Sequence, residues 1–334
     1  MSVSVESGFA VRVMAAEDDL WAPASRSYPA YRSVAEPDCS LRTPFQRDRD
    51  RIVHCKSFRR LKHKTQVFVA PEGDHFRTRL THTLEVTQIS RTVARALRLN
   101  EDLTEAIGLG HDVGHPAFGH IGEDVLDRHS NERFGAPFRH FEHSLRVVDV
   151  LEPLNLCEEV RDGILRHSSR AEMPSTLEGR IVRIVDRIAY INHDIDDALR
   201  AGVIGPEDLP HEEIGVLGDT GSDRIDRLVH DLVEHSATAG DIVQGPEVGP
   251  AMMRLRQFMF DHVYLGPTAR QEHAKIERVM GGLFDWFCAH PEDLPPGVDG
   301  ASLGERVVDH LAGMTDRFAI REWTRLAVPV GLEL

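Results

Sequence analysis

The sequence predicts an all-α protein. Apolar residues recur at helical spacing through most of the chain, no segment alternates apolar and polar residues as a half-buried strand would, and no internal repeat is present. With 334 residues, of which 41% are hydrophobic and 28% charged, the chain can bury one large core or two modest ones. We therefore expect helices packed on helices.

Charge and cysteine content argue against several classes of protein. The formal net charge of −15 disfavours binding of the whole surface to nucleic acid or anionic lipid, so an anionic substrate needs a local basic cluster. The four cysteines form no CxxC pair, which is typical of a reduced cytoplasmic protein and not of a disulfide framework or a thiolate zinc site. We recognise no signal peptide and no membrane span, and predict a cytoplasmic protein without a membrane partner.

Composition divides the chain into three regions. Residues 1–41 are rich in Pro, Ser and Ala and lack apolar periodicity, which predicts a poorly ordered N-terminal arm. Residues 42–205 form the core, which opens with a basic segment, 42–64. A solvated helix face usually explains such a segment, but on an acidic protein it also indicates phosphate binding. Residues 206–334, divided by Gly and Pro, are expected to form a helical C-terminal region.

The apolar pattern predicts helices in order along the core and the C-terminal region. On the first of them, Leu80, Leu84, Ile89, Val93 and Leu97 mark the inner face. The expected core helices span residues 76–98, 102–109, 117–129, 142–152, 158–167 and 178–199, and the C-terminal helices span 251–264, 272–290 and 303–325.

The stretch 110–123 concentrates side chains that can bind a metal ion or transfer a proton: three histidines and two carboxylates. His111 and Asp112 offer a divalent cation one imidazole nitrogen and one carboxylate oxygen. Because adjacent side chains leave a helix on different sides, both can bind one ion only where the backbone turns, and flanking glycines permit such a bend. His120 and Glu123, three residues apart, would share a helix face as an acid–base pair.

Two residues elsewhere could complete a metal site. Asp186 lies inside an apolar helical run, where an unpaired charge is costly, so it must be paired, hydrogen-bonded or metal-bound. A salt bridge with Arg183 or Arg187 is the structural alternative. His82 lies on the first helix, where a lone histidine is more often at the surface or satisfied in the core. Two imidazoles and two carboxylates would suit Mg or Mn, with Fe, Ni or Zn as alternatives. Spacing alone leaves open whether they converge.

The order of these residues resembles the H…HD…D signature of the HD superfamily of metal-dependent phosphohydrolases. Longer stretches are similar to the deoxyguanosinetriphosphate triphosphohydrolase-like proteins, and the resemblance extends over about residues 42–330. These stretches are Thr43–Arg51, Phe58–Phe68, Arg77–Val86, Ala189–Ala198 and Leu311–Asp316.

The resemblance implies an all-helical HD fold with additional HD-associated helices at the C-terminus. It also implies an enzyme that cleaves a deoxynucleoside triphosphate (dNTP) at the α-phosphate, releasing deoxynucleoside and inorganic triphosphate. By position, the divalent metal ligands are His82, His111, Asp112 and Asp186. The catalytic positions are His120 and Glu123, with His115 approaching the phosphates. The triphosphate or deoxyribose contacts are Gln66, Arg79, His140, Arg187, Tyr190 and Asp194.

Two other functions are compatible with an HD fold. The chain could hydrolyse another nucleotide, as a 5′-nucleotidase or phosphodiesterase, or it could be a non-catalytic nucleotide sensor. The intact acid–base pair argues against a sensor, which has no need of an acid. The resemblance also implies a homo-oligomer, and a nucleotide effector is a further expectation. Phe141 is a departure, because the family often has Asn there and Phe cannot form a hydrogen bond. Contacts near His140 should therefore differ.

Overall fold

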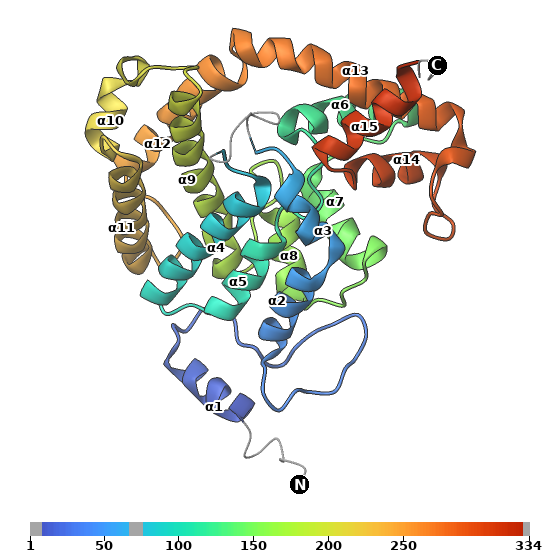
Figure 1. Cartoon of the computed structure of the whole chain (residues 1–334). Coiled ribbons are helices and arrows are strands. Elements are labelled where there is room, and N and C mark those ends of the chain that lie inside the picture. Colours follow the sequence, from blue (N-terminus) through green and yellow to red (C-terminus); the bar gives the residue numbers. More distant parts are fainter. Residues whose placement is uncertain (1–8, 67–75, 330–334) are drawn as a thin grey trace.

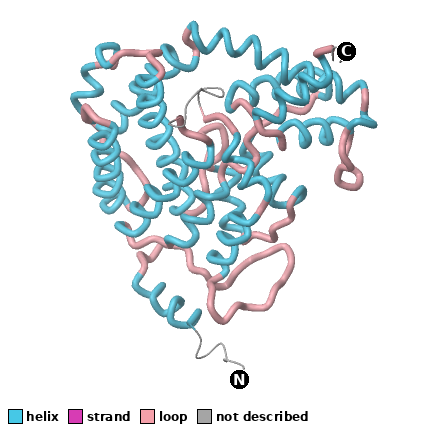
Figure 2. Tube along the Cα trace, in the orientation of Figure 1, coloured by secondary structure: helices cyan, strands magenta, loops and turns pink. Residues whose placement is uncertain are grey.

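A computed structural model of the chain describes residues 9–66 and 76–329. Three parts of the predictions lie outside these described residues: 1–8 of the N-terminal arm, 67–68 of the motif Phe58–Phe68, and 330–334 of the C-terminal region. All regular secondary structure in the described residues is helical, which confirms the all-α prediction (Figure 1, Figure 2). None of their helices is both long enough and apolar enough to cross a membrane.

The core contains eight α-helices in the described residues. Several of them begin at side-chain caps: for example, Thr43 accepts a hydrogen bond from the Gln46 amide, and Asn100 from the Leu103 amide. The core helices are α2 (Pro44–His54), α3 (Lys56–Arg60), α4 (Arg79–Ala96), α5 (Glu101–Gly110), α6 (Gly119–Phe134), α7 (His140–Arg146), α8 (Glu158–Arg166) and α9 (Leu177–Arg200).

The inner face of α4 was predicted only in part. Val93 and Leu97 are buried, but Leu84 is 45% exposed, so that assignment was wrong. Instead, Arg79, His82 and Thr83 face inward. The apolar pattern could not identify this face, because here α4 borders a polar cavity and not the apolar core.

The C-terminal region follows α9 as a second set of helices. Figure 1 shows α13 bridging the molecule from α12 to the side where α6, α14 and α15 lie. The single helix predicted over 303–325 is wrong: it is broken at 313–315, and Thr315 caps a new helix by accepting from the Phe318 amide. These helices are α10 (His211–Leu217), α11 (Gly221–Ala239), α12 (Val248–Met259), α13 (Pro267–Ala289), α14 (Leu303–Ala312) and α15 (Asp316–Ala327).

The buried apolar side chains form two clusters. The larger unites α2, α4, α5, α8 and α9 with α11 and α12. The smaller joins α6 to α13, α14 and α15, with Leu126, Phe284 and Leu311 almost fully buried. As a result, α6, which carries His120 and Glu123, packs against the C-terminal helices.

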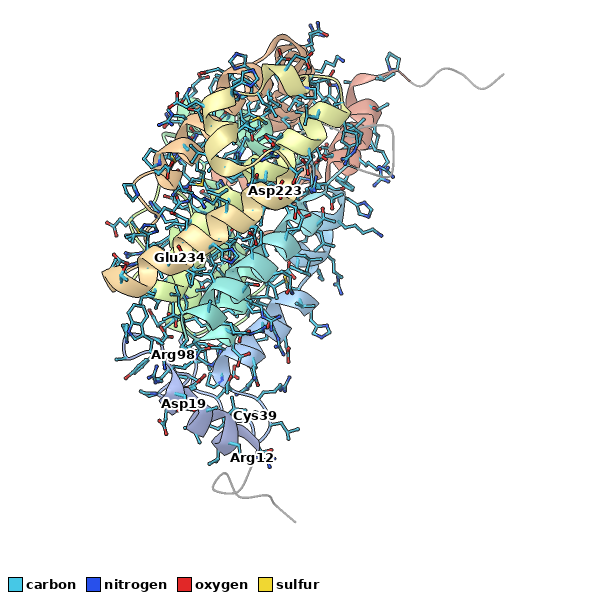
Figure 3. The ribbon with its side chains drawn as sticks, turned by 90° about the vertical axis from the view of Figure 1, so that its left-hand side faces the viewer. Arg12, Asp19, Cys39, Arg98, Asp223 and Glu234 are labelled. Atoms are coloured by element: carbon cyan, nitrogen blue, oxygen red, sulfur yellow. The ribbon has the colours of Figure 1, made fainter. Side chains whose placement is uncertain are left out.

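The N-terminal arm contains α1 (Phe9–Ala16) followed by an irregular segment that contacts the core. Ser25 donates from its amide and hydroxyl to Glu178 of α9, and Arg32 pairs with the buried carboxylate of Asp48. Exposed acids contribute to the negative net charge of the protein. Two of them, Asp223 and Glu234 on α11, are labelled in the side view of Figure 3.

The basic segment 42–64 serves structure in this molecule. Arg47 and Arg51 pair with Glu36 of the arm, and Arg49 pairs with Glu105 of α5. None of its residues lines the cavity that holds the predicted site residues. The phosphate-binding interpretation of this segment is therefore not supported, because the segment does not line the cavity and four of its six arginines pair with carboxylates.

Candidate active site

One cavity of about 160 Å³ collects the predicted site residues. Its walls come from α4, the turn after α5, α6, α7, α9 and α12. Of the thirteen residues predicted, all except His111 line the cavity, and His111 lies directly behind Asp112. The lining residues are Gln66, Arg79, His82, Asp112, His115, His120, Glu123, His140, Asp186, Arg187, Tyr190 and Asp194.

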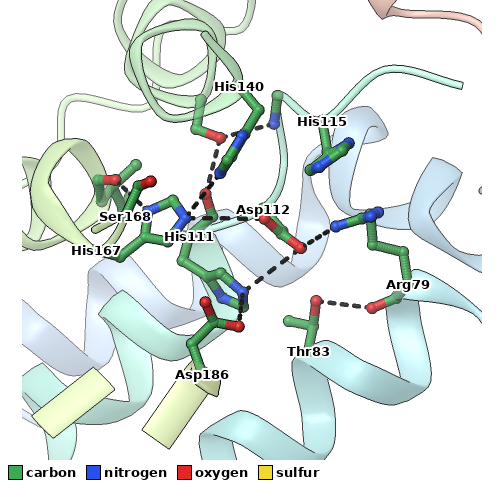
Figure 4. Close-up of polar contacts among 12 residues, drawn as sticks. Arg79, Thr83, His111, Asp112, His115, His140, His167, Ser168 and Asp186 are labelled. Atoms are coloured by element: carbon green, nitrogen blue, oxygen red, sulfur yellow. Dashed lines mark hydrogen bonds and ion pairs between the residues drawn. The ribbon is translucent and has the colours of Figure 1, made fainter. Parts of the chain in front are cut away.

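The H…HD…D residues converge at this cavity, and Figure 4 shows three of them, His111, Asp112 and Asp186, close together. His82 Nε2 lies 3.1 Å from Asp186 Oδ1, and His111 Nε2 lies 3.9 Å from the same oxygen. His111 Nε2 is also 3.6 Å from Asp112 Oδ2. Asp186 makes no ion pair with Arg183 or Arg187, so the structural alternative for this acid is wrong. Arg183 instead donates to backbone carbonyls, that of Arg166 among them.

The donor set fits a divalent metal ion. His111 Nδ1 lies 2.7 Å from the Gly108 carbonyl and donates to it, so the lone pair is on Nε2. That Nε2 is buried and has no hydrogen-bond partner among the described residues. Burial alone would raise the pKa of Asp112, but neighbouring His111 and Arg79 lower it well below its usual value, so this carboxylate is ionised. A buried cluster of imidazole and carboxylate donors is thus ready to bind.

The His-Asp turn, residues 111–118, is held by a close contact with α7. A Cβ on Gly114 would lie 2.2 Å from the Ser144 backbone nitrogen, so only glycine allows this approach. Ser144 Oγ accepts from the Gly114 amide and donates to the His111 carbonyl. The predicted bend is therefore confirmed, but Gly114 is required for packing and has no positive φ.

Glu123 is shared by two histidines. Its Oε2 lies 3.4 Å from His120 Nδ1, as the spacing predicts, and both its oxygens lie 2.9 Å from His140 Nδ1. His115 Nε2 is 3.9 Å from the same carboxylate. Burial would raise the pKa of Glu123, but His140 and His120 lower it well below its usual value. The carboxylate is therefore an anion between imidazoles.

The hydrogen bonds of His140 make it a cation. His167 Nδ1 donates to the Ile164 carbonyl, so neutral His167 accepts at Nε2, which lies 3.2 Å from His140 Nε2. His140 must then donate from both nitrogens. Burial lowers the pKa of His140, but the Glu123 carboxylate outweighs this and raises it, whereas burial and its neighbours lower the pKa of His167 to about 3. Phe141 packs edge-on against His140, with 5.6 Å between ring centroids.

Cationic side chains border the cluster. Arg79 pairs with Asp112 through Nη1, while its Nη2 is buried and has no hydrogen-bond partner in the part of the chain that the structure describes. Arg187 has a long contact, 3.7 Å, from Nη1 to Met253 Sδ. Arg256 of α12 donates to the Tyr190 hydroxyl. Five arginines and five carboxyl groups line the cavity, so its arginines match its acids in number, although the protein as a whole is acidic.

The cavity also holds a buried carboxyl group, that of Asp194. The Tyr264 hydroxyl donates to Asp194 Oδ2, and Asp194 Oδ1 is buried with no hydrogen-bond partner among the residues described. Burial raises the pKa of Asp194 to about 8. Tyr190 lies between this group and Asp186 on α9, and all three line the cavity.

Several residues of the cavity were not predicted. His167, Arg256 and Tyr264 line it, and Ser144 supports the His-Asp turn. No sequence pattern identifies these residues as part of the site. His167 follows the end of α8 outside any motif, and Arg256 and Tyr264 reach the cavity from the C-terminal region. Their role depends on helix packing.

Two parts of the chain match known domain families, residues 79–191 the HD domain and residues 242–325 the phosphohydrolase-associated domain. A deoxyguanosinetriphosphate triphosphohydrolase-like protein of Caldanaerobacter subterraneus subsp. tengcongensis is 52% identical over 306 residues, 89% of either chain. The protein so named in Clostridium perfringens is 46% identical over 312 residues, 89% of this chain and 90% of its own. Among solved structures, a hypothetical protein from Aquifex aeolicus matches 82% of this chain and 67% of its own, at 21% identity and a TM-score of 0.49.

Identity near one half over almost nine tenths of the chain confirms the resemblance found in the sequence motifs. The HD domain and its associated helical domain also occur here in order. The chain therefore belongs to the deoxyguanosinetriphosphate triphosphohydrolase-like family of HD-domain phosphohydrolases.

Proposed function

We propose that this protein is a metal-dependent dNTP triphosphohydrolase that releases deoxynucleoside and inorganic triphosphate. The observation that carries the proposal is the shared cavity, in which the His/Asp cluster, the His120–Glu123 pair and several arginines face one hollow. The names and identity of the relatives support the substrate class.

We assign four ligands of a divalent ion: His82, His111, Asp112 and Asp186. The unpartnered Nε2 of His111 and the N/O donor set support this assignment. Without a thiolate, the set suits Mg or Mn, and also Fe, Ni or Zn. When bound, the ion supplies a Lewis acid for phosphate oxygens and a nucleophilic water.

The triphosphate would be held by the cationic side chains. A guanidinium binds two phosphate oxygens at once, and the buried Nη2 of Arg79 has no partner yet. Arg187 and Arg256 face the same cavity. Burial lowers the pKa of His115 well below its usual value, so this ring is neutral and can donate one N–H to a phosphate oxygen.

His120 would protonate the leaving group. When the bond between the α-phosphorus and the 5′ oxygen breaks, the departing deoxynucleoside oxygen needs a proton, which His120 Nε2 can donate. The His120 side chain is 67% exposed at the cavity, so Nε2 can reach substrate, while Nδ1 faces Glu123. The carboxylate fixes the tautomer and stabilises the protonated ring.

Product analysis tests the proposal. Each of the four dNTPs is incubated with purified protein and Mn²⁺, and the products are separated by anion-exchange chromatography and assigned by ³¹P NMR. We expect deoxynucleoside and inorganic triphosphate in equal amounts, and none with Asp186→Ala. Orthophosphate or pyrophosphate as the first product would reject this reaction in favour of another nucleotide hydrolase. Binding of dNTP without turnover would favour the sensor.

A further inference from the structure

The motif Leu311–Asp316 lies outside the cavity and has no part in the chemistry described so far. It spans the end of α14 and the start of α15, the break that the helical pattern failed to predict. Its last residue, Asp316, is 4% exposed although it begins a helix at the periphery of the molecule. A buried carboxylate needs hydrogen-bond donors, and the donors of Asp316 show which segments of the chain it connects.

Within residues 9–66 and 76–329, all hydrogen-bond donors to the Asp316 side chain come from two segments that border the cavity. Oδ2 accepts from the Thr65 amide at 2.8 Å and from the Thr65 hydroxyl. Oδ1 accepts from the Phe118 amide at 2.9 Å. These segments are more than 190 residues away in the sequence. One side chain of the C-terminal region therefore joins the segment before α4 to the end of the His-Asp turn.

Phe118 has an unfavourable backbone conformation for a residue with a side chain. It has φ 62° and ψ 23°, the left-handed conformation that residues with a Cβ rarely adopt, and it directly precedes α6. The next residue, Gly119, also has a positive φ, and a Cβ there would lie 3.2 Å from the Gln66 carbonyl. The direction in which α6 starts, and with it the position of His120, depends on this turn.

A second contact connects the same segments. Lys64 Nζ, which is buried, donates to the His115 carbonyl and, at 2.9 Å, to the Ala312 carbonyl at the end of α14. The His-Asp turn is thus held at its middle and at its end by residues that all meet the Leu311–Asp316 motif.

We propose that Asp316 is a positioning residue, which holds Phe118 in its left-handed conformation and so aims His120 and Glu123 at the substrate. The inference rests on the proposed function for its kinetic readout, because it assigns the effect to the protonation step. Asn is the informative substitution. Its amide keeps the shape, but its NH₂ group would face an N–H donor on either the Thr65 or the Phe118 side.

The experiment compares Asp316→Asn with Thr315→Ala in the full chain with Mn²⁺ and dGTP. Thr315 caps α15 through the Phe318 amide and has no hydrogen bond to Thr65 or Phe118, so its loss reports the general effect of weakening this helix. For Asp316→Asn we expect kcat to fall about 10- to 100-fold, as for a catalytic group misplaced by about 1 Å, with KM and metal content within about twofold of wild type. Thr315→Ala should leave kcat within about twofold.

A double variant separates positioning from a general loss of structure. In a His120→Asn background, Asp316→Asn should reduce kcat no further, since the group it positions is gone. A second loss of the same factor, or an unchanged kcat in the single variant, would overturn the proposal.

Hydrogen–deuterium exchange gives a readout that does not need turnover. Exchange of peptides covering 113–123 should rise at least tenfold in Asp316→Asn and not in Thr315→Ala. If the wild type hydrolyses no dNTP but this difference is present, the proposed function fails and the positioning role stands. If exchange is unchanged, the positioning role fails.

Discussion

Among the single residues, Glu123 joins histidines that come from different helices of the site. It accepts from His120 and, through both oxygens, from His140, which also donates to His167. Only the His120–Glu123 contact was predicted, because the spacing of residues on one helix reports contacts within that helix. His140 and His167 reach the same carboxylate from α7 and the end of α8. Glu123 therefore orients one imidazole that is exposed to substrate and one that is buried.

Loss of His120 should slow the reaction without releasing the metal. We expect kcat of His120→Asn to fall about 10²–10⁴-fold, the range for a positioned proton donor, with unchanged metal content. Glu123→Gln should give a smaller fall, since the imidazole remains but its charged form loses its partner. Single-turnover rates and metal analysis on both variants test this. Metal loss in His120→Asn would make His120 a ligand, and a near-normal rate would leave it no catalytic role.

Tyr190 should discriminate against ribonucleotides. Its hydroxyl is engaged by Arg256, so the ring face is the part left to pack against deoxyribose, where a 2′-hydroxyl would need more room. The kcat/KM ratio of dGTP over GTP should fall about tenfold in Tyr190→Ala and stay near wild type in Tyr190→Phe, which keeps the ring. Equal hydrolysis of the two nucleotides by the wild type would contradict this role.

Asp194 should make stability depend on pH. Its pKa is about 8 in the folded protein against 3.8 without burial, so between these values the native state keeps a proton that the unfolded chain has released. The free energy of unfolding should therefore fall as pH rises, by up to about 1.4 kcal/mol per pH unit, and Asp194→Asn should lack this contribution. Urea unfolding at pH 5, 6, 7 and 8 measures the difference. Parallel pH profiles of the two proteins would refute the shifted pKa.

At the scale of elements, α6 links the chemistry to the C-terminal region. Its inner face belongs to the smaller apolar cluster, and Phe284 of α13 contacts the rings of His129 and Phe134 on α6. The predicted ranges of α6 and α13 were close to those observed. Their packing against each other was not predictable, because the apolar face of a helix does not specify which other helix will cover it.

Truncation of Phe284 should therefore weaken the junction of the two regions. Phe284 is 1% exposed, and its replacement by Ala should cost about 3–5 kcal/mol of unfolding free energy. Phe318→Ala is the matched control, because Phe318 on α15 is 36% exposed and should cost less than about 1 kcal/mol. Denaturant unfolding compares the two. Equal losses would show that burial in this cluster does not decide stability.

At the scale of the whole molecule, the proposed ligands come from three places in the chain. His82 is on α4, His111 and Asp112 follow α5, and Asp186 is on α9. These helices already pack together in the larger apolar cluster. An ion bound there would link them, but the apolar contacts should hold the fold without it.

Metal binding should thus stabilise a protein that is already folded. At a free Mn²⁺ concentration 100 times Kd, the gain should be about 2.7 kcal/mol, and EDTA should reverse it without loss of helix content. His82→Ala and Asp186→Ala should lose turnover and the shift in Tm while keeping the circular dichroism spectrum. Calorimetry with and without Mn²⁺ provides the test. An Asp186→Ala protein with full activity would show the ligand set to be wrong.

The sequence by itself determined the all-helical class, most helix ranges, the family and the residues of the metal-site signature, because these depend on local periodicity and on motifs read in order. Tertiary structure decided the rest. It showed that Leu84 is exposed, that Arg47 and Arg51 neutralise Glu36, and that Asp316 reaches Phe118. The physical reason is the same in each case: burial and hydrogen-bond partners are set by segments distant in sequence, and no local pattern encodes which segments will meet.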